Sequence, residues 1–509
     1  MKDSVLKGGL ILVVAGVLGK ILGAFYRIPL SNILTPEGIG LYQMIFPVFS
    51  LALIISSGGV SATVAHAVAK IRASGEGSIK DIFKQGFLYT LILSVFFALI
   101  FLIFGDQIAT LQGNPLAGAG YKMCAFALIF SSLLASFRGL FQGFQNMVPT
   151  AVSQTLEQMF KVVFGLVFAY FFSQTSLGLG VVGAFLGITI AEIISLFYLI
   201  FKLKTQKIHF FYKKTQKNSF FKTNFIITAS FLIIPALTTF DSFAVINLLS
   251  QNFTSATSTA LYGLQSGMVN SLINFPVVVS VAISLSILPS LTFFLTQSEH
   301  EKAKEVVSKI FNFLLILLLP CVLIFVFFAE DIFAFIYPSL DSNLLSTASL
   351  LLQISSFQIL FISILQISTS VFQSLDKPTL PILFMSLAGA VKILSTILLV
   401  GIPAINIFGL AISNFLFYAI AGVLTLVFVK KLLPFSLKTK TLAVLIPSLT
   451  ILCTSFWLVN VYITSFWVKI FWIGISSLVT YVLPMLYFDI FEIKDSLKKI
   501  VLKWRTKNE

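Results

Sequence analysis

The sequence predicts an all-α protein that crosses a membrane many times, and three observations lead to this prediction. Hydrophobic residues make up 58% of the 509 positions, charged residues only 10%, and the mean hydropathy is +1.01. This apolar share exceeds that of soluble domains. The apolar residues also form continuous runs of about 20 residues, as transmembrane helices do, and not the alternating pattern of a membrane β-barrel.

Charged or turn-rich breaks divide the chain into fourteen predicted transmembrane helices. They cover residues 8–30, 40–67, 86–104, 121–143, 154–172, 179–201, 225–249, 259–290, 305–329, 344–373, 380–401, 405–429, 440–461 and 464–487.

The basic residues indicate the orientation of these spans. Of the 34 lysine and arginine residues, 27 fall in the two termini and in alternate connections. The positive-inside rule therefore places both termini in the cytoplasm. The basic loop 202–224 and the amphipathic basic tail 488–509 are expected to lie on anionic lipid, so the net charge of +15 requires no nucleic-acid partner.

The two halves of the chain repeat short strings in the same order. Leu140-Phe141-Gln142-Gly143 resembles Val371-Phe372-Gln373-Ser374, and the same shift superposes Lys161 on Lys392. Six spans in each half predict two lobes, 1–201 and 225–429, related as parallel repeats by a pseudo-twofold axis along the membrane normal. Residues 430–487 then form two appended helices.

Basic residues inside the first span are candidates for binding an anionic substrate, because burying a charge in a membrane requires compensation. Lys20 and Arg27 are seven residues apart and share a helix face. Arginine can hold a diphosphate with two hydrogen bonds, and lysine can meet it as a point charge. Alternatively, Arg27 reaches the lipid head groups and Lys20 has a structural partner.

Asp241 lies in the seventh span at the depth of Lys20, which favours a charge-balancing pair between the lobes. It could instead bind Na⁺ or a proton and couple transport to an ion gradient, or make a polar contact within its own lobe.

Four further ionisable residues lie in later spans. Glu157 and Lys161 have the i, i+4 spacing of a helix ion pair, and Glu192 is at a depth where it could compete for Lys161. Spans 380–401 and 405–429 hold no carboxylate, which makes Lys392 a second substrate-binding candidate beside Lys161. Arg138 is expected to face lipid phosphate.

The sequence indicates neither a metal nor an enzymatic site. It contains no phosphate-binding loop and no spacing typical of a nucleophile with its base. The three cysteines and three histidines lie far apart in the sequence and form no cluster of metal ligands. They are Cys124, Cys321, Cys453, His66, His209 and His300. We therefore expect a transporter without a cofactor, not an enzyme.

Several longer strings resemble the MOP flippase superfamily, in particular its branch of stage V sporulation protein B and polysaccharide export proteins. The strings are Gly19–Leu30, Glu37–Met44, Ser56–Val60, Phe137–Gly143, Pro149–Gln158, Lys377-Pro378 and Ile405–Ser413. The resemblance implies an alternating-access flippase of the bacterial cytoplasmic membrane. Its cargo would be an undecaprenyl-pyrophosphate-linked sugar such as lipid II or a polysaccharide unit.

Two other functions stay open at this point, and we expect a monomer in each case. One is a cation-coupled multidrug antiporter of the same superfamily, which would suit twelve spans and an acidic cavity. The other is a membrane-embedded cell-wall polymerase or ligase, which would require a catalytic base in a large outer loop. The MurJ-type lipid II flippases carry two arginines where this chain has the apolar stretch 51–54, so the identity of the sugar is open as well.

Overall fold

The structure is a computed structural model that describes residues 2–205, 220–436 and 439–488. Within these ranges the chain is helical and contains no strand, as the sequence predicts. Residues 206–219 of the predicted basic loop 202–224 lie outside the described residues. Residues 489–509 of the predicted tail do so as well.

The first nine helices are α1 (Lys2–Ser57), α2 (Val60–Ser74), α3 (Ile79–Leu111), α4 (Gly118–Gly143), α5 (Val148–Ser173), α6 (Leu177–Thr205), α7 (Phe220–Phe231), α8 (Ile233–Leu249) and α9 (Ser255–Gly263). The others are α10 (Asn270–Thr296), α11 (His300–Phe327), α12 (Ala329–Ile336), α13 (Ser342–Ser356), α14 (Gln358–Ser374), α15 (Thr379–Val400), α16 (Phe408–Leu432), α17 (Thr439–Tyr462), α18 (Phe466–Ser476) and α19 (Leu483–Tyr487).

Among the described residues, twelve helical segments are long and apolar enough to cross a membrane. The bent pair α7 and α8, with an angle of 52° at the break, raises this number to thirteen. One of the twelve, Val14–Ser74, is 61 residues long and contains most of the first predicted span, 8–30, and all of the second, 40–67. The predicted number of fourteen depends on how often this segment crosses, and it stays a prediction.

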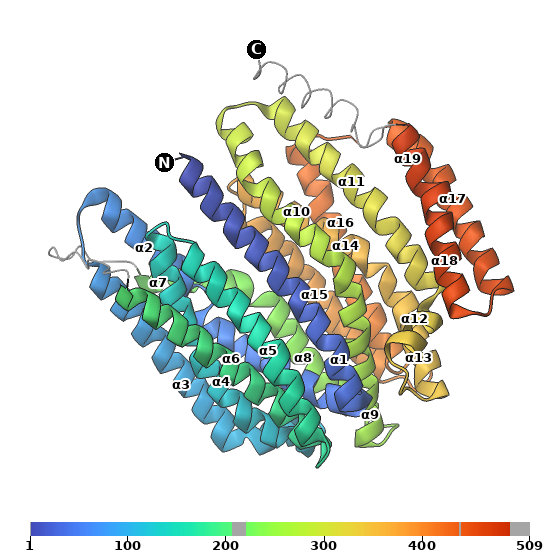
Figure 1. Ribbon diagram of the computed structural model, residues 1–509, viewed down its shortest axis with the longest axis horizontal. Helices are drawn as coiled ribbons and strands as arrows, with labels where there is room; N and C mark the ends of the chain where they lie inside the picture. The colour runs from blue at the N-terminus through green and yellow to red at the C-terminus, as the bar shows by residue number, and fades with distance from the viewer. Residues whose placement is uncertain (1, 206–219, 437–438, 489–509) are drawn as a thin grey trace. The chain divides into compact units, whose positions relative to one another are not determined.

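Helix α1 bends sharply at Thr35, whose φ of 62° and ψ of 172° are not helical. Thr35 precedes Pro36, and a proline ring disfavours the helical conformation of the residue before it. In Figure 1 the N-terminal part of α1 is the dark blue helix that begins at the label N.

The two parts of this segment run in opposite directions. Val14 lines a cavity together with Ala151 near the start of α5. Val68 packs against Gly143 at the end of α4, which is the same end of the α4–α5 hairpin. The chain therefore reverses near Thr35, and Val14–Ser74 passes along these helices twice.

The chain divides into two compact units whose boundaries fall inside α10, α15 and α16. Unit 1 comprises Met1–Val278 and Met385–Phe417, and unit 2 comprises Val279–Phe384 and Tyr418–Glu509. The lobe limits predicted from the sequence follow the order of the chain and are not tested by this division.

The turns after the repeated strings have the same backbone geometry in both halves. Gln145 and Asp376, which the repeat superposes, both have a positive φ, 59° and 55°. The amide of the next residue closes each turn, from Asn146 to Phe141 O at 3.0 Å and from Lys377 to Phe372 O at 2.9 Å. The predicted repeat is thus visible as a shared local structure.

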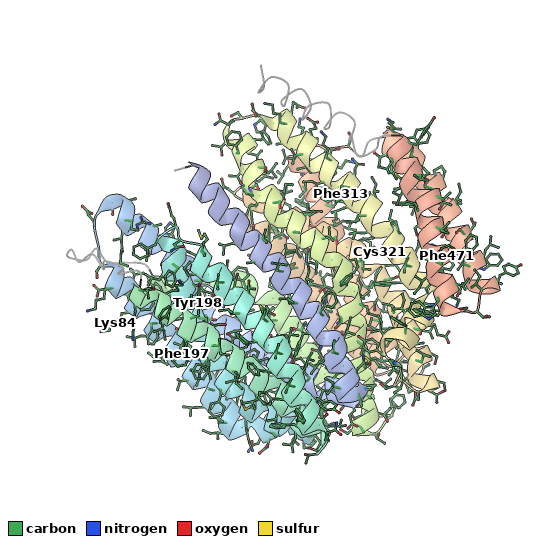
Figure 2. All side chains as sticks on the ribbon, viewed as in Figure 1. Lys84, Phe197, Tyr198, Phe313, Cys321 and Phe471 are labelled. Carbon is green, nitrogen blue, oxygen red and sulfur yellow. The ribbon has the colours of Figure 1, made fainter. Side chains whose placement is uncertain are left out.

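Large apolar side chains are exposed on the outer faces of many helices. Phe197, Phe313 and Phe471, labelled in Figure 2, are 67%, 39% and 63% exposed. Such apolar exposure would be unfavourable in water and is expected on a surface that faces lipid. Together with the twelve segments described above, it establishes a multi-pass membrane protein.

Close helix packing in unit 1 relies on residues without side chains. A Cβ atom at Gly187 of α6 would lie 2.2 Å from the backbone nitrogen of Gly165 in α5, and one at Gly165 would lie 2.9 Å from the Tyr26 ring in α1. Glycine at these positions lets α1, α5 and α6 approach closely. This contact positions the charged residues of α5 beside α1.

Candidate functional site

Glu157 of α5 forms an ion pair with Arg138 of α4. Arg138 Nη2 lies 2.6 Å from Glu157 Oε2, and Arg138 Nε donates to Ser153 Oγ at 3.0 Å. The two charged side chains are only 16% and 19% exposed. Arg138 therefore has a carboxylate partner, whereas the sequence suggested lipid phosphate. Glu157 pairs with the neighbouring helix and not with Lys161, because the guanidinium group reaches across to it.

Lys161 and Arg27 lie around a single aromatic ring. Lys161 Nζ is 5.8 Å from the centre of the Phe46 ring and 5.2 Å from that of Tyr26. Arg27 Cζ is 5.8 Å from the centre of the same Phe46 ring. These are cation–π distances, and the two positive charges are near enough to repel each other.

Neither Arg27 nor Lys161 forms an ion pair with a carboxylate among the described residues. Both residues are half-buried and lie on membrane-spanning helices. The structure thus brings together two of the four predicted substrate-binding residues, and neither has a carboxylate at ion-pair distance among the described residues. Glu157 and Glu192 attract Lys161 only from a longer distance. The side chain of a third, Lys20, lies outside the described residues, so its role stays a prediction.

Glu192 of α6 is buried, with 6% of its surface exposed. Its Oε1 accepts a hydrogen bond from Ser131 Oγ at 2.7 Å, and its Oε2 has no hydrogen-bond partner among the described residues. Glu192 therefore does not pair with Lys161, which was the predicted alternative. It is a buried carboxylate without a cation at ion-pair distance among the described residues.

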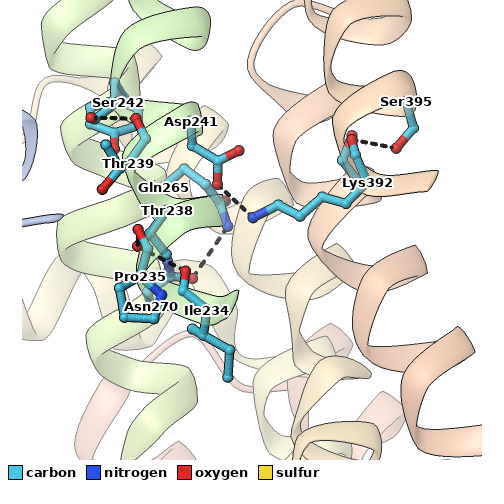
Figure 3. Close-up of polar contacts among 12 residues, drawn as sticks. Ile234, Pro235, Thr238, Thr239, Asp241, Ser242, Gln265, Asn270, Lys392 and Ser395 are labelled. Atoms are coloured by element: carbon cyan, nitrogen blue, oxygen red, sulfur yellow. Dashed lines mark hydrogen bonds and ion pairs between the residues drawn. The ribbon is translucent and has the colours of Figure 1, made fainter. Parts of the chain in front are cut away.

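Asp241 of α8 pairs with Lys392 of α15, and both residues belong to unit 1. Figure 3 shows Lys392 reaching towards Asp241, with Nζ 2.6 Å from Oδ2. The two side chains are 7% and 4% exposed. The sequence suggested Lys20 as the partner of Asp241 and left Lys392 without a carboxylate. Spans 380–401 and 405–429 hold no carboxylate, and the partner of Lys392 comes from α8 instead.

A network of uncharged polar residues holds α8 against the helices around it. Gln112, which follows α3, donates from Nε2 to Ser242 Oγ in α8 and to Met44 O in α1, both at 3.0 Å. Tyr121 OH donates to Gln112 Oε1 at 2.8 Å. Ser242 is the neighbour of Asp241 in the chain, so this network anchors α8 next to the residue that carries the carboxylate. Sequence reasoning, which followed charges, did not find it.

Unit 2 contains a further ion pair that sequence reasoning missed, after Arg138–Glu157 and Asp241–Lys392 in unit 1. Lys469 Nζ of α18 lies 2.9 and 2.8 Å from the two carboxylate oxygens of Asp331 in α12, and 3.3 Å from Asn460 Oδ1. The sequence does contain a signal for this ion pair, because Lys469 is a charged residue inside the predicted span 464–487 and such a residue requires a partner. The pair links the appended helices to α12.

Comparison with known proteins identifies the family. The model of the family described as polysaccharide biosynthesis protein matches residues 5–294, more than half of the chain, and the MatE model matches residues 227–398. Stage V sporulation protein B of Bacillus subtilis (strain 168) is 26% identical over 455 residues, which cover 87% of this chain and 86% of that protein. Lipid II flippase MurJ of the same organism is 23% identical and covers 79% of this chain and 78% of its own length.

Solved structures support the same fold. The inward closed conformation of lipid II flippase MurJ matches with a TM-score of 0.68 and 16% identity, covering 96% of this chain and 100% of that one. An inward-facing multidrug resistance MATE family transporter of the MOP superfamily matches with a TM-score of 0.66 and 14% identity, covering 82% and 94%. The chain belongs to the polysaccharide biosynthesis protein family and is a multi-pass membrane transporter of the MOP superfamily.

Proposed function

We propose that this protein is a flippase that moves a polyprenyl-pyrophosphate-linked saccharide across the bacterial cytoplasmic membrane by alternating access. Both termini would lie in the cytoplasm, as the distribution of basic residues predicts. The names of two relatives, stage V sporulation protein B and lipid II flippase MurJ, support this class of cargo.

One observation carries the proposal: Arg27 and Lys161 surround Phe46, and neither has a carboxylate partner among the described residues. Holding two like charges together inside a membrane protein is unfavourable unless an anion joins them. A diphosphate supplies that anion, since its oxygens can accept two hydrogen bonds from Arg27 and meet Lys161 as a point charge. The Phe46 and Tyr26 rings orient the lysine, and the polyprenyl chain stays in lipid.

The three acidic candidates have different partners, which suggests different roles. Glu157 is neutralised by Arg138 and Asp241 by Lys392, so we assign charge balance to these two carboxylates. We assign the binding of a coupling proton or sodium ion to Glu192, which has no ion-pair partner among the described residues. If transport by a Glu192→Gln variant still responded to an imposed ion gradient as the wild type does, this assignment would fail.

The multidrug antiporter is the competing function within the superfamily. Its cationic substrates would be repelled by Arg27 and Lys161, which have no carboxylate partner among the described residues. The flippase is therefore the function that the charges of this site favour.

Complementation of cells depleted of their lipid II flippase tests the cargo. We expect the wild-type protein to restore growth, and Arg27→Gln or Lys161→Gln to fail although each is present in the membrane. Lys122→Gln is the matched control, because Lys122 is a 45% exposed surface cation of α4 paired with Asp106. Absence of growth with the wild-type protein would reject lipid II as cargo, and growth with both site variants would reject the anion site.

A further inference from the structure

Unit 2 contains an apolar cavity of about 150 Å³ between α11, α14, α16 and the segment that follows α16. Its walls include Leu314, Leu318, Leu360, Ile364 and Leu426. The stacked rings of Phe311 and Phe435, with centres 4.9 Å apart and an interplanar angle of 9°, also line it. Lys430 is the one charged residue among the described residues that line this cavity.

The cavity suits a segment of hydrocarbon chain. Apolar cavities of about 150 Å³ stay dry and bind molecules as large as benzene. Leu315, Leu360 and Ile364 line the cavity and are only half-buried, so part of its wall reaches the surface of the unit. In a membrane this surface contacts lipid, and an acyl chain can enter from there.

The charge of Lys430 indicates which kind of head group that hydrocarbon chain carries. The lysines of α11 are paired with carboxylates at 2.6 to 2.7 Å, as Lys302–Glu299, Lys304–Glu301 and Lys309–Glu305. Lys430, in the last turn of α16, forms no ion pair with a carboxylate among the described residues. It lies in a basic segment assigned to the cytoplasmic side, where membranes expose anionic head groups.

We propose that this cavity binds one acyl chain of an anionic phospholipid whose phosphate is held by Lys430. The apolar walls select a hydrocarbon chain and the lysine selects a negative head group, so the site prefers phosphatidylglycerol to phosphatidylcholine with the same chains. The residues that line this cavity do not include Arg27 or Lys161, and the proposal does not depend on which saccharide is carried.

Lipid binding to the purified, delipidated full-length protein tests the head-group preference. Native mass spectrometry with phosphatidylglycerol or phosphatidylcholine of identical chains gives the apparent affinity for each lipid. We expect Lys430→Gln to weaken phosphatidylglycerol binding about fivefold, since one basic residue near anionic lipid contributes about 1 kcal/mol. Phosphatidylcholine binding should weaken less, because its choline cation offsets the charge of the phosphate. Lys431→Gln is the matched control, because Lys431 is the exposed neighbour that does not line the cavity.

A second pair of variants tests the cavity itself. Leu315→Trp fills the space and is expected to weaken binding of both lipids, whereas Phe313→Trp, at an exposed position of the same helix, is not. Each variant is compared with the wild type for its melting temperature without added lipid, which detects misfolding. Equal losses from Lys430→Gln and Lys431→Gln would show a general basic surface and overturn the proposal. Wild-type binding by a folded Leu315→Trp would overturn it too.

Discussion

The ion pairs of the membrane-spanning helices sort the charged residues into neutralised and unneutralised groups. Asp241 and Lys392 are almost fully buried and contact each other directly, and Glu157 and Arg138 do the same at higher exposure. Arg27 and Lys161 have aromatic rings where the others have carboxylates. At the scale of single residues, this difference separates charges that have a carboxylate in contact from charges that have none, and it is the basis on which we propose Arg27 and Lys161 as ligand-binding residues.

The Asp241–Lys392 pair should be strongly coupled. Removing one partner leaves the other as an uncompensated buried charge, so Asp241→Asn or Lys392→Met alone should cost about 3–5 kcal/mol of stability. The double variant removes both charges and should recover most of that loss. Thermal unfolding of the purified proteins and their abundance in the membrane measure this coupling, and strictly additive losses would show that the two residues are not partners.

The Arg138–Glu157 and Asp241–Lys392 pairs mark the limit of what sequence can predict at the scale of residues. Lys20 and Lys392 lie at the same depth when counted from the start of their spans, so depth alone did not decide between them as partner of Asp241. The choice depends on which helices are neighbours, and this is a property of the tertiary fold. The same holds for Arg138, for which the sequence suggests lipid phosphate. The sequence around Arg138 does not show that α5 places Glu157 beside it.

Sequence was more informative about the helical elements. Apolar runs located nearly all the membrane-spanning helices. The repeated strings predicted related halves, and the turns that follow these strings share positive φ values at Gln145 and Asp376. The bend of α1 at Thr35 falls in the break between the predicted spans 8–30 and 40–67, where Pro36, Glu37 and Gly38 interrupt the apolar runs. Pro36 is the sequence signal for this bend, because a proline disfavours the helical conformation of the residue before it.

The break between α1 and α2 at Gly58-Gly59 is a close-packing site. A Cβ atom at Gly59 would lie 2.6 Å from Asn224 O and 2.7 Å from Thr228 Oγ1 of α7, and the Gly59 amide donates to that hydroxyl at 3.1 Å. Glycines inside a helical span can permit either bending or close packing, and this geometry supports packing.

Gly59→Ala should therefore destabilise the protein by about 1–3 kcal/mol, the usual cost of overpacking. Gly474→Ala is the matched control, because a Cβ atom there meets nothing within 4 Å and alanine is the better helix former. Melting temperatures of the two purified variants measure the difference. A Gly59→Ala variant as stable as the control would contradict the packing account.

At the scale of the whole molecule, the number and direction of the membrane crossings can be mapped. In a protein whose three native cysteines are replaced, single cysteines at Lys84 and at Thr254 should label differently with a membrane-impermeant reagent applied from outside. The positive-inside rule assigns Lys84 to the cytoplasm and Thr254 to the opposite side, so only the second should react. Equal labelling in intact cells would reject the fourteen-span arrangement.

Transport of a lipid-linked saccharide in vesicles tests the central claim most directly. Purified protein is reconstituted with a fluorescent polyprenyl-pyrophosphate-linked saccharide, and an impermeant quencher reports the rate at which the head group reaches the outer leaflet. The wild type and Lys122→Gln should accelerate this exchange over protein-free vesicles, while a folded Arg27→Gln, Lys161→Gln double variant should not. Exchange by the wild type no faster than in protein-free vesicles, or undiminished exchange by the double variant, would contradict the account.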